Sequence, residues 1–542
     1  MYTSARPTGG VAKVGPCSAF CPPMPTRLST PRTLRPAGPI RPAFRWPVVL
    51  AATAVAASAF LAGCTAAPPY KVPDSPMPAA FKEGGPWKTA QPRQAGSDLA
   101  WWKIYGDPVL DGLQDEAARA NQTLKQAEAA WRQARALTDQ ARAGLFPTAG
   151  VSGGSSRART DTTGSRLTTT DSVGLSASWQ PDFWGGVRSS IDAAGATAAA
   201  SGDDLAAARL SIQSTLAQDY FQLRVTDALR ALYATTIDAY EKALKLTQAQ
   251  RAAGTALLSD VSLAQSQLAT ARASAVDLEA TRQQYEHAIA VLTGRAPSDF
   301  AITRTPASDA VAWSLPAAPV GVPSQLLERR PDIAAAERRV AAANANIGVA
   351  RAAYFPALTL SASGGFAGPS FGSLFTVPNR VWSLGAALAE TIFDGGLRDA
   401  RKAQAVAAYD ASVASYRQVV LTGFQQVEDQ LALLDTLGRE NVFQQQAVDA
   451  ARTSERLALA QYRGGTATYL SVITAQQLSL TAQRTAMQLR GRQVVATVAL
   501  IAATGGGFDQ AAVATNNAPL PADSALPAAP AQPDTIQAEP RS

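Results

Sequence analysis

The chain of 542 residues contains an internal duplication. Phe146-Pro147 returns about 210 residues later as Phe355-Pro356, with the same kinds of segment around each copy. Three more landmarks keep nearly the same offset: Gly185-Gly186 with Gly395-Gly396, Gly254-Thr255 with Gly465-Thr466, and Leu292-Thr293-Gly294 with Ala503-Thr504-Gly505. A unit this long is a duplicated half-domain, not the repeat of about 20–50 residues that builds a solenoid. The duplication predicts two pseudo-symmetric halves in one protomer, which suits a ring or a barrel.

The first 63 residues resemble an export leader. They contain no acidic residue and seven basic ones, and an apolar run covers Pro47–Phe60. That run is too short to span a membrane as a helix, but it has the length of a signal-peptide core. Leu61-Ala62-Gly63-Cys64 resembles the bacterial lipobox, which implies cleavage before Cys64 and acylation of that cysteine, palmitate included. We expect the mature chain to begin at a lipid anchor.

Removal of the leader changes both the net charge of the chain and the number of cysteines available for disulfides. The whole chain has a formal net charge of +7, and the leader carries seven basic residues without an acid. The mature chain is therefore neutral overall, which argues against nucleic acid as a partner. Cys17 and Cys21 leave with the leader and Cys64 is expected to be acylated, so the mature fold should hold without disulfides.

Six segments have the pattern of helices, and four of them are long. Apolar residues recur every seven positions, as at Leu216, Leu223 and Leu244. A helix of about 65 residues would measure about 95 Å, far more than an ordinary globular domain. In each half, the shorter helix and the second long helix nearly match the first long helix in combined length, so they could stack end to end beside it. The expected helices cover about 121–143, 186–250, 254–293, 331–353, 397–462 and 466–504.

Short alternating segments lie between the shorter and the longer helices. Apolar and small or polar residues alternate in 173–180, 358–363 and 382–386, and Val151 begins a weaker fourth run. Each run is about 9–11 residues long, the length of a tilted membrane-spanning strand. Either these strands form a small soluble β-domain, or they cross a membrane in a barrel that several protomers close, because four strands cannot close one.

Several motifs together resemble one family. They are Trp101-Trp102, Gly106-Asp107-Pro108, Glu328-Arg329-Arg330-Pro331-Asp332-Ile333, Phe393-Asp394-Gly395-Gly396 and Tyr462-Arg463-Gly464-Gly465-Thr466. On these motifs the chain resembles the outer-membrane factors of tripartite efflux pumps, the TolC-like superfamily, in its lipidated NodT branch. The resemblance implies a mainly α fold with a membrane β portion: a homotrimer whose twelve-stranded transmembrane β-barrel is continued by a long periplasmic α-helical barrel. It also implies two partners, a periplasmic adaptor (membrane fusion) protein and an inner-membrane transporter of RND or ABC type.

The landmarks divide the chain into six segments. The leader is followed by a lipid anchor with an N-terminal linker, the first outer-membrane-factor repeat, an inter-repeat linker, the second repeat and an Ala/Pro-rich tail expected to be disordered. Their expected boundaries are 1–63, 64–100, 101–294, 295–330, 331–507 and 508–542.

Residues for catalysis or metal binding are scarce. His287 is the only histidine, and it lies on a predicted helix beside Tyr285 and Glu286. One histidine without a free cysteine provides neither the usual zinc ligands nor a Cys–His dyad, and no phosphate-binding or dinucleotide motif is found in its required context. We expect neither enzymatic activity nor a cofactor nor a metal.

The family resemblance also implies where such a channel closes. In the family, the periplasmic helix tips carry a gate tyrosine and acidic residues after each Gly-Thr turn; Tyr462 and Asp260 match two of these positions. Ser471 and Thr474 stand where the family commonly has aspartates, so an acidic ring would come from Asp260 alone. The alternative is that Asp260 only stabilises the start of its own helix. The tips expected to meet the adaptor contain Gly254, Thr255, Arg463, Gly465 and Thr466.

These features predict a passive outer-membrane channel subunit of a tripartite pump that exports small molecules, such as drugs, toxic compounds or metals. It would be lipid-anchored in the cell outer membrane, with a periplasmic helical extension. Two alternatives stay open: the outer-membrane component of a type I protein secretion system, and a coiled-coil lipoprotein that spaces the envelope. A lipoprotein hydrolase is disfavoured because the catalytic residues are missing.

Overall fold

The computed structural model describes residues 68–74, 81–82, 100–160, 166–304 and 329–506. The predicted leader, Cys64 and the predicted disordered tail lie outside these residues, as does most of the expected inter-repeat linker. The chain divides into two units, Met1–Ala62 and Gly63–Ser542, and all that follows concerns the second.

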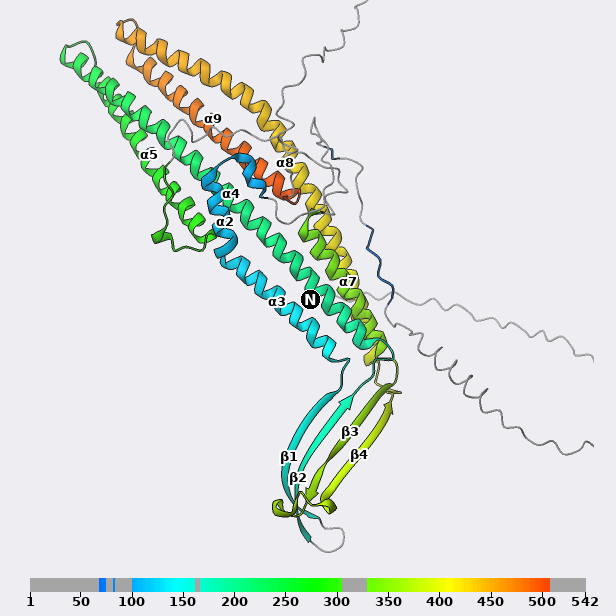
Figure 1. Cartoon of the computed structure of the whole chain (residues 1–542). Helices are drawn as coiled ribbons and strands as arrows, with labels where there is room; N and C mark the ends of the chain where they lie inside the picture. The colour runs from blue at the N-terminus through cyan, green and yellow to red at the C-terminus, as the bar shows by residue number, and fades with distance from the viewer. Residues whose placement is uncertain (1–67, 75–80, 83–99, 161–165, 305–328, 507–542) are drawn as a thin grey trace, which may run out of the picture. The chain divides into compact units, whose positions relative to one another are not determined.

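Two halves of the chain repeat the same succession of elements (Figure 1). In each half a helix of 22 residues precedes two strands, a helix of 67 residues and a helix of 35 residues. The equal lengths confirm the duplication. The first half contains α3 (Gln122–Ala143), β1 (Thr148–Thr160), β2 (Arg166–Trp179), α4 (Gly186–Ala252) and α5 (Leu258–Leu292). The second contains α7 (Pro331–Ala352), β3 (Ala357–Gly368), β4 (Arg380–Ala389), α8 (Leu397–Arg463) and α9 (Tyr469–Ala503).

Each of the two longest helices packs against two shorter ones. Helices α3 and α5 contact α4, and α7 and α9 contact α8. The shorter helices follow one another along the longer helix, as their lengths predicted (Figure 1). The halves meet where α4 contacts α7 and α9. Within the described residues, no helix has an apolar stretch long enough to cross a membrane.

The structure corrects the expected elements at α2 and at three of the strands. Helix α2 (Pro108–Ala120) was not expected, although Asp107 caps it through the amides of Val109 and Leu110 and Pro108 occupies its first position. Three strands are longer than the expected 9–11 residues: β1 has 13, β2 has 14 and β3 has 12, whereas β4 has 10. The added residues are mostly Gly, Ser, Thr and Arg, which contribute no apolar alternation.

The largest core lies where η1 (Trp101–Tyr105) and α2 pack against α4. Trp101 is 2% exposed, and Tyr220 and Phe221 are fully buried. The Tyr220 hydroxyl donates a hydrogen bond of 2.5 Å to Asp107 Oδ2. The Trp-Trp and Gly-Asp-Pro motifs therefore have structural roles.

Two buried arginines connect segments that are distant in sequence. Arg282 on α5 donates to Asp227 Oδ1 on α4 at 2.8 Å and to the Ile302 carbonyl at 2.7 Å. This fixes the segment after η2 (Pro297–Asp299) against the first half. Arg330 pairs with Asp332 and donates to the Ala503 carbonyl at 3.0 Å, which connects the start of α7 to the end of α9. The Arg-Pro-Asp motif is thus structural as well.

Candidate functional site: hairpin tips and strand faces

The two helical hairpins, α4–α5 and α8–α9, end in matching turns. Thr255 N donates to the Gln250 carbonyl at 2.9 Å, and Thr466 N donates to the Gln461 carbonyl at 3.0 Å. Gly254 and Gly465 have φ of 78° and 73°, values that glycine adopts without strain. Because these residues end the first helix of each hairpin, α5 and α9 begin at residues 258 and 469, later than predicted. All four turn residues and Arg463 are exposed.

Asp260 and Ser471 occupy equivalent positions at the starts of α5 and α9. Each is the third helical residue. Asp260 Oδ2 accepts a hydrogen bond from Leu257 N at 3.3 Å, and the Ser471 hydroxyl lies 3.2 Å from the Thr468 hydroxyl. The contact of Asp260 with its own helix start is the one that the alternative hypothesis predicted. Asp260 is half-buried, whereas Ser471 and Thr474 are exposed.

Tyr462 lies inside the tip region rather than on its surface. It is 7% exposed, and its ring centroid is 5.2 Å from that of Tyr469 on α9. Ala264 of the first hairpin joins the same cluster as Val472 of the second, so the cluster connects the two hairpins. Tyr469 was missed from the sequence, although an aromatic residue seven positions after Tyr462, across a tight turn, was a usable signal.

Polar groups of both hairpins face each other beside this cluster. Gln267 Nε2 on α5 lies 3.4 Å from Gln476 Oε1 on α9. Burial raises the pKa of Tyr469 to about 12; a hydrogen bond with Thr247 lowers it, and the charge of Asp260 contributes to the rise. The structure therefore brings together Asp260, Tyr462 and Tyr469 where the two hairpins of one protomer meet.

The four strands form one antiparallel sheet in the order β1-β2-β3-β4. Trp179 is opposite Leu360, and Leu360 is opposite Ala386. Because side chains alternate along a strand, this register separates two faces. One face is apolar and carries Val151, Val173, Leu175, Trp179, Leu358, Leu360, Phe366, Trp382, Leu384 and Leu388. The opposite face carries Ser152, Ser172, Ser176, Ser178, Thr359, Ser361, Ser363 and Ser383 with several Gly and Ala residues.

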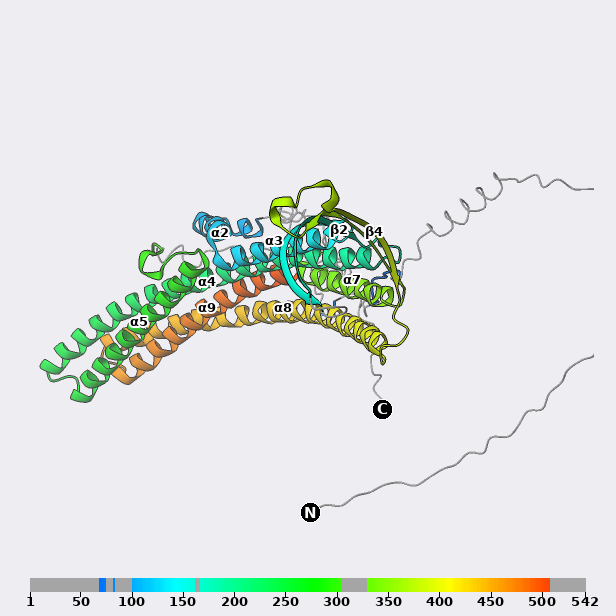
Figure 2. The same cartoon turned by 90° about the horizontal axis from the view of Figure 1, so that it is seen from below.

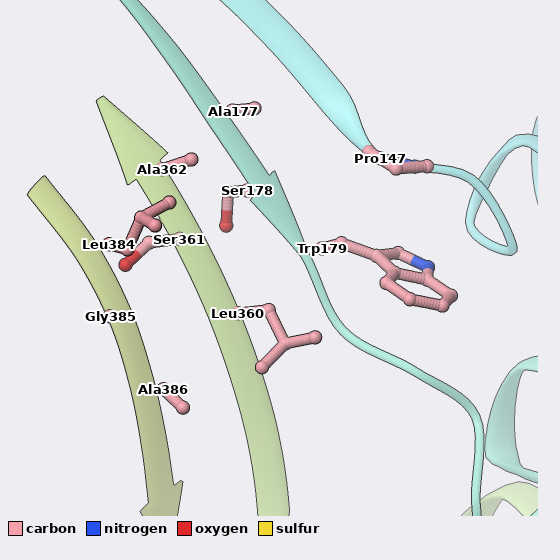
Figure 3. Close-up of a pocket in the computed structure, with 10 residues that line it drawn as sticks. All are labelled: Pro147, Ala177, Ser178, Trp179, Leu360, Ser361, Ala362, Leu384, Gly385 and Ala386. Atoms are coloured by element: carbon pink, nitrogen blue, oxygen red, sulfur yellow. The ribbon is translucent and has the colours of Figure 1, made fainter. Parts of the chain in front are cut away.

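The apolar face is open in one protomer. Val151, Leu175 and Leu384 are 76%, 64% and 75% exposed. A hollow of about 510 Å³ lies at its helix-proximal end, and Figure 3 shows Trp179 and Leu360 pointing to the same side of the sheet there. The hollow has no titratable lining residue. His287 is exposed, and no group of His, Cys, Asp or Glu in the described part of the chain could hold a metal.

The chain matches the family model for outer membrane efflux protein over residues 113–295 and 322–506. The pyoverdine export outer membrane protein OpmQ of Pseudomonas aeruginosa is 33% identical over 466 residues, which cover 84% of this chain and 96% of OpmQ. The outer membrane protein OprJ of the same species is 33% identical over 459 residues, with 83% and 94% covered.

Solved structures give the same result. The outer-membrane channel OprN has a TM-score of 0.76 and 30% identity, over 82% of this chain and 99% of that one. The MtrE outer membrane channel of Neisseria gonorrhoeae has a TM-score of 0.74 and 28% identity, over 82% and 98%.

The fold is that of the trimeric TolC-like outer-membrane channels, mainly helical with a membrane-spanning β portion and a periplasmic helical barrel. The chain belongs to the outer membrane efflux protein family. Its function is efflux across the outer membrane, and members of this family are transport ducts rather than enzymes.

Proposed function

We propose that three copies of the chain form the passive exit duct of a tripartite pump, together with a periplasmic adaptor and an inner-membrane RND-type or ABC transporter. The observation that carries this proposal is the sheet: it has an apolar face, a small-residue face and two open edges, β1 and β4. Backbone groups at an open edge have no partners in lipid, so the edges of neighbouring copies must pair. Three copies of four strands reach the size of known membrane barrels, and one copy does not.

The small-residue face would line the duct. Between Ser172 and Ser178 on β2, and along all of β3 and β4, this face carries only Ser, Thr, Gly, Ala and Val. An uncharged, wet lining selects weakly among solutes, so the inner-membrane transporter would choose the cargo. Small molecules fit this picture, as do the relatives that are named for pyoverdine export and toluene efflux.

The hairpin tips would close the duct and contact the adaptor. Gly254, Thr255, Arg463, Gly465 and Thr466 are the exposed residues that we assign to the adaptor contact. We assign the gate to Asp260, Tyr462, Ser471 and Thr474. Support comes from the cluster around Tyr462, because opening the tips requires the two hairpins of a protomer to separate there.

The acyl anchor at Cys64 is part of the proposal. The Pro68 carbonyl accepts a hydrogen bond of 3.0 Å from Asn344, eight residues before the end of α7 and thus near the sheet. The Tyr70 hydroxyl donates to Glu337 at 2.5 Å, and the Asp74 carbonyl accepts from Arg417 on α8 at 3.1 Å. The segment that follows Cys64 therefore runs along α7 and α8 with its first described residue nearest the membrane portion.

Deleting the gene tests the proposal against its rivals. We expect a deletion strain to accumulate a fluorescent efflux dye, and the parent gene on a plasmid to restore the low level. The matched control is the parent strain treated with a proton uncoupler, which should accumulate dye to a similar extent if the pump is proton-driven. Normal dye levels together with loss of one protein from the medium would instead favour type I secretion. Normal dye levels and secretion with a changed envelope spacing would favour the tether.

A further inference from the structure

The connection between β3 and β4 is a folded, uncharged loop with apolar side chains on its surface. This loop, residues 369–379, contains two short turns, η3 (Phe371–Ser373) and η4 (Val377–Asn379). Phe371, Phe375 and Val377 are 68%, 62% and 75% exposed, whereas Leu374 is fully buried. Exposed apolar side chains that gather on one short loop mark a surface that contacts a partner or a membrane.

Hydrogen bonds hold this loop in one conformation. Asn379 Nδ2 donates to the Ser373 carbonyl at 2.7 Å, and the Thr376 hydroxyl donates to the same carbonyl at 2.8 Å. The Ser370 and Ser373 hydroxyls are 2.9 Å apart. The apolar side chains are therefore presented by a preformed structure.

Two contacts place the loop over the apolar face of the sheet. The ring centroids of Phe375 and Phe366 are 5.4 Å apart, and Phe366 belongs to the apolar face. A Cβ on Gly368, which would point to the same face, would lie 2.6 Å from Asn379 Nδ2. The loop thus folds back over the apolar face, at the end of the strands farthest from the helices (Figure 1). Figure 2 shows the same end of the sheet from below.

The register shows how deep the loop lies. Along the apolar face, successive rows run from Leu358 and Leu388 near the helices to Val173, Phe366 and Arg380 at the far end. Five such rows span about 27 Å along a strand and about 20 Å across a tilted barrel, close to the height of an outer-membrane apolar band. Beyond the last apolar row, β1 and β2 carry Asp171 and Arg157 on that face. With these rows in the hydrocarbon, an assignment that rests on the proposed function, the loop would lie at the outer boundary of the bilayer.

We propose that residues 369–379 form a lipid-binding platform in the outer leaflet. Phe371, Phe375 and Val377 would contact acyl chains just below the headgroups, where aromatic side chains are favoured. Arg380, which is exposed and follows the platform as the first residue of β4, would reach the lipid phosphates. A second copy of the chain is a poorer occupant, because edge pairing extends the sheet sideways whereas the loop lies on its face.

The duplication offers an internal comparison. The β1–β2 hairpin holds the equivalent place in the first half, but its described end carries Arg157 and Arg159 beside Leu167, and no aromatic residue. The two halves thus share one architecture and differ in the chemistry at their outer ends. One anchor and one polar hairpin per protomer would fix each protomer in the leaflet and leave the polar hairpins toward water.

Nitroxide labels at single cysteines test the platform. The full chain would be reconstituted in vesicles of phosphatidylethanolamine and phosphatidylglycerol, with labels placed by Phe371→Cys or Val377→Cys. Leu384→Cys on the apolar face and Ser176→Cys on the small-residue face are matched controls; all four positions are exposed in the protomer. Parent protein treated in the same way gives the background from the cysteines of the natural sequence. The readout is the ratio of collision rates with oxygen, which enters lipid, and with a nickel chelate, which stays in water.

We expect the ratio at Phe371→Cys and Val377→Cys to equal that at Leu384→Cys and to exceed that at Ser176→Cys several-fold. A ratio equal to that of Ser176→Cys would place the loop in water and overturn the proposal. Low collision rates with both reagents would mean that a neighbouring protomer covers the loop, which overturns it as well. If Leu384→Cys and Ser176→Cys do not differ, the assignment of the sheet faces fails, and this outcome is distinct from failure of the platform alone.

Discussion

At the hairpin tips, Asp260 has two roles that different substitutions can distinguish: it carries a charge and it caps the start of its helix. Asp260 and Ser471 are both third residues of their helices, yet only Asp260 carries a charge. Asp260 also accepts the hydrogen bond from Leu257 N. A substitution can therefore act through the charge at the tip or through the start of α5, and the choice of variant decides which effect is measured.

Removing the charge of Asp260 should weaken cation selectivity in planar bilayers and block by trivalent cations. Asp260→Asn is the informative variant, because its side-chain oxygen still accepts from Leu257 N. Asp260→Ala should have the same electrical effect and in addition lower stability by about 0.5–1 kcal/mol through loss of the bond at the helix start. Ser471→Asp and Thr474→Asp should strengthen block. Unchanged selectivity in all four variants would place the constriction elsewhere.

Asp219 on α4 should make the fold less stable as the pH rises. Burial raises its pKa to about 6 from an ordinary value of 3.8. The folded state therefore binds the proton more tightly than the unfolded state, so this stabilisation is complete below about pH 4 and is lost as pH rises through 6. Asp219→Asn should be more stable than the parent by about 1–2 kcal/mol at pH 8, and equal to it at pH 4. Thermal unfolding of the purified protein at both pH values provides the test, and the same difference at pH 4 and pH 8 would contradict it.

Among the elements, the crossing of α4 and α9 depends on one glycine. A Cβ on Gly491 would lie 2.6 Å from Val225 Cγ2, whereas a Cβ on Gly438 of α8 would meet nothing within 4 Å. Both glycines lie inside long helices, so they differ in packing and not in backbone context. Substitutions at these two glycines therefore test whether the close approach of α4 and α9, which joins the two halves, contributes to stability.

Gly491→Ala should lower the unfolding temperature and Gly438→Ala should raise it. The first forces Val225 to move, which costs about 1–3 kcal/mol. The second removes the conformational freedom of a helical glycine and stabilises by about 0.5–1 kcal/mol. Thermal unfolding in detergent measures both. If the two variants change stability in the same direction, the packing described for this crossing is wrong.

The sequence predicted the elements that rest on long, local patterns. The seven-residue repeat of apolar residues and the turn glycines located all four long helices within a few residues. The landmarks repeated about 210 residues apart indicated that the two tips are equivalent. Three strands were predicted too short, because Gly, Ser and Thr continue a strand without an alternating apolar pattern. Helix α2 was missed although Asp107 and Pro108 form a standard helix start. The burial of Tyr462 could not be read from the sequence, because it depends on contacts between two hairpins that lie about 200 residues apart.

For the whole molecule, the open sheet edges matter most. One protomer provides four strands with two unpaired edges and an apolar face that is largely exposed. Such a sheet is stable in a membrane only when other copies complete it. Helical hairpins of equal length in both halves then give each protomer two equivalent contributions to a periplasmic tunnel. Because of the duplication, each half of a protomer contributes two strands to the sheet and one helical hairpin to the tunnel.

Native mass spectrometry of the full-length protein, released from detergent micelles, tests whether several protomers share one barrel. We expect a complex of three times the protomer mass, with no appreciable monomer under conditions that preserve the β-sheet signal in circular dichroism. A monodisperse monomer with full strand content and no need for detergent would contradict it, because the unpaired edges of β1 and β4 would then be stable in water and no shared barrel would exist.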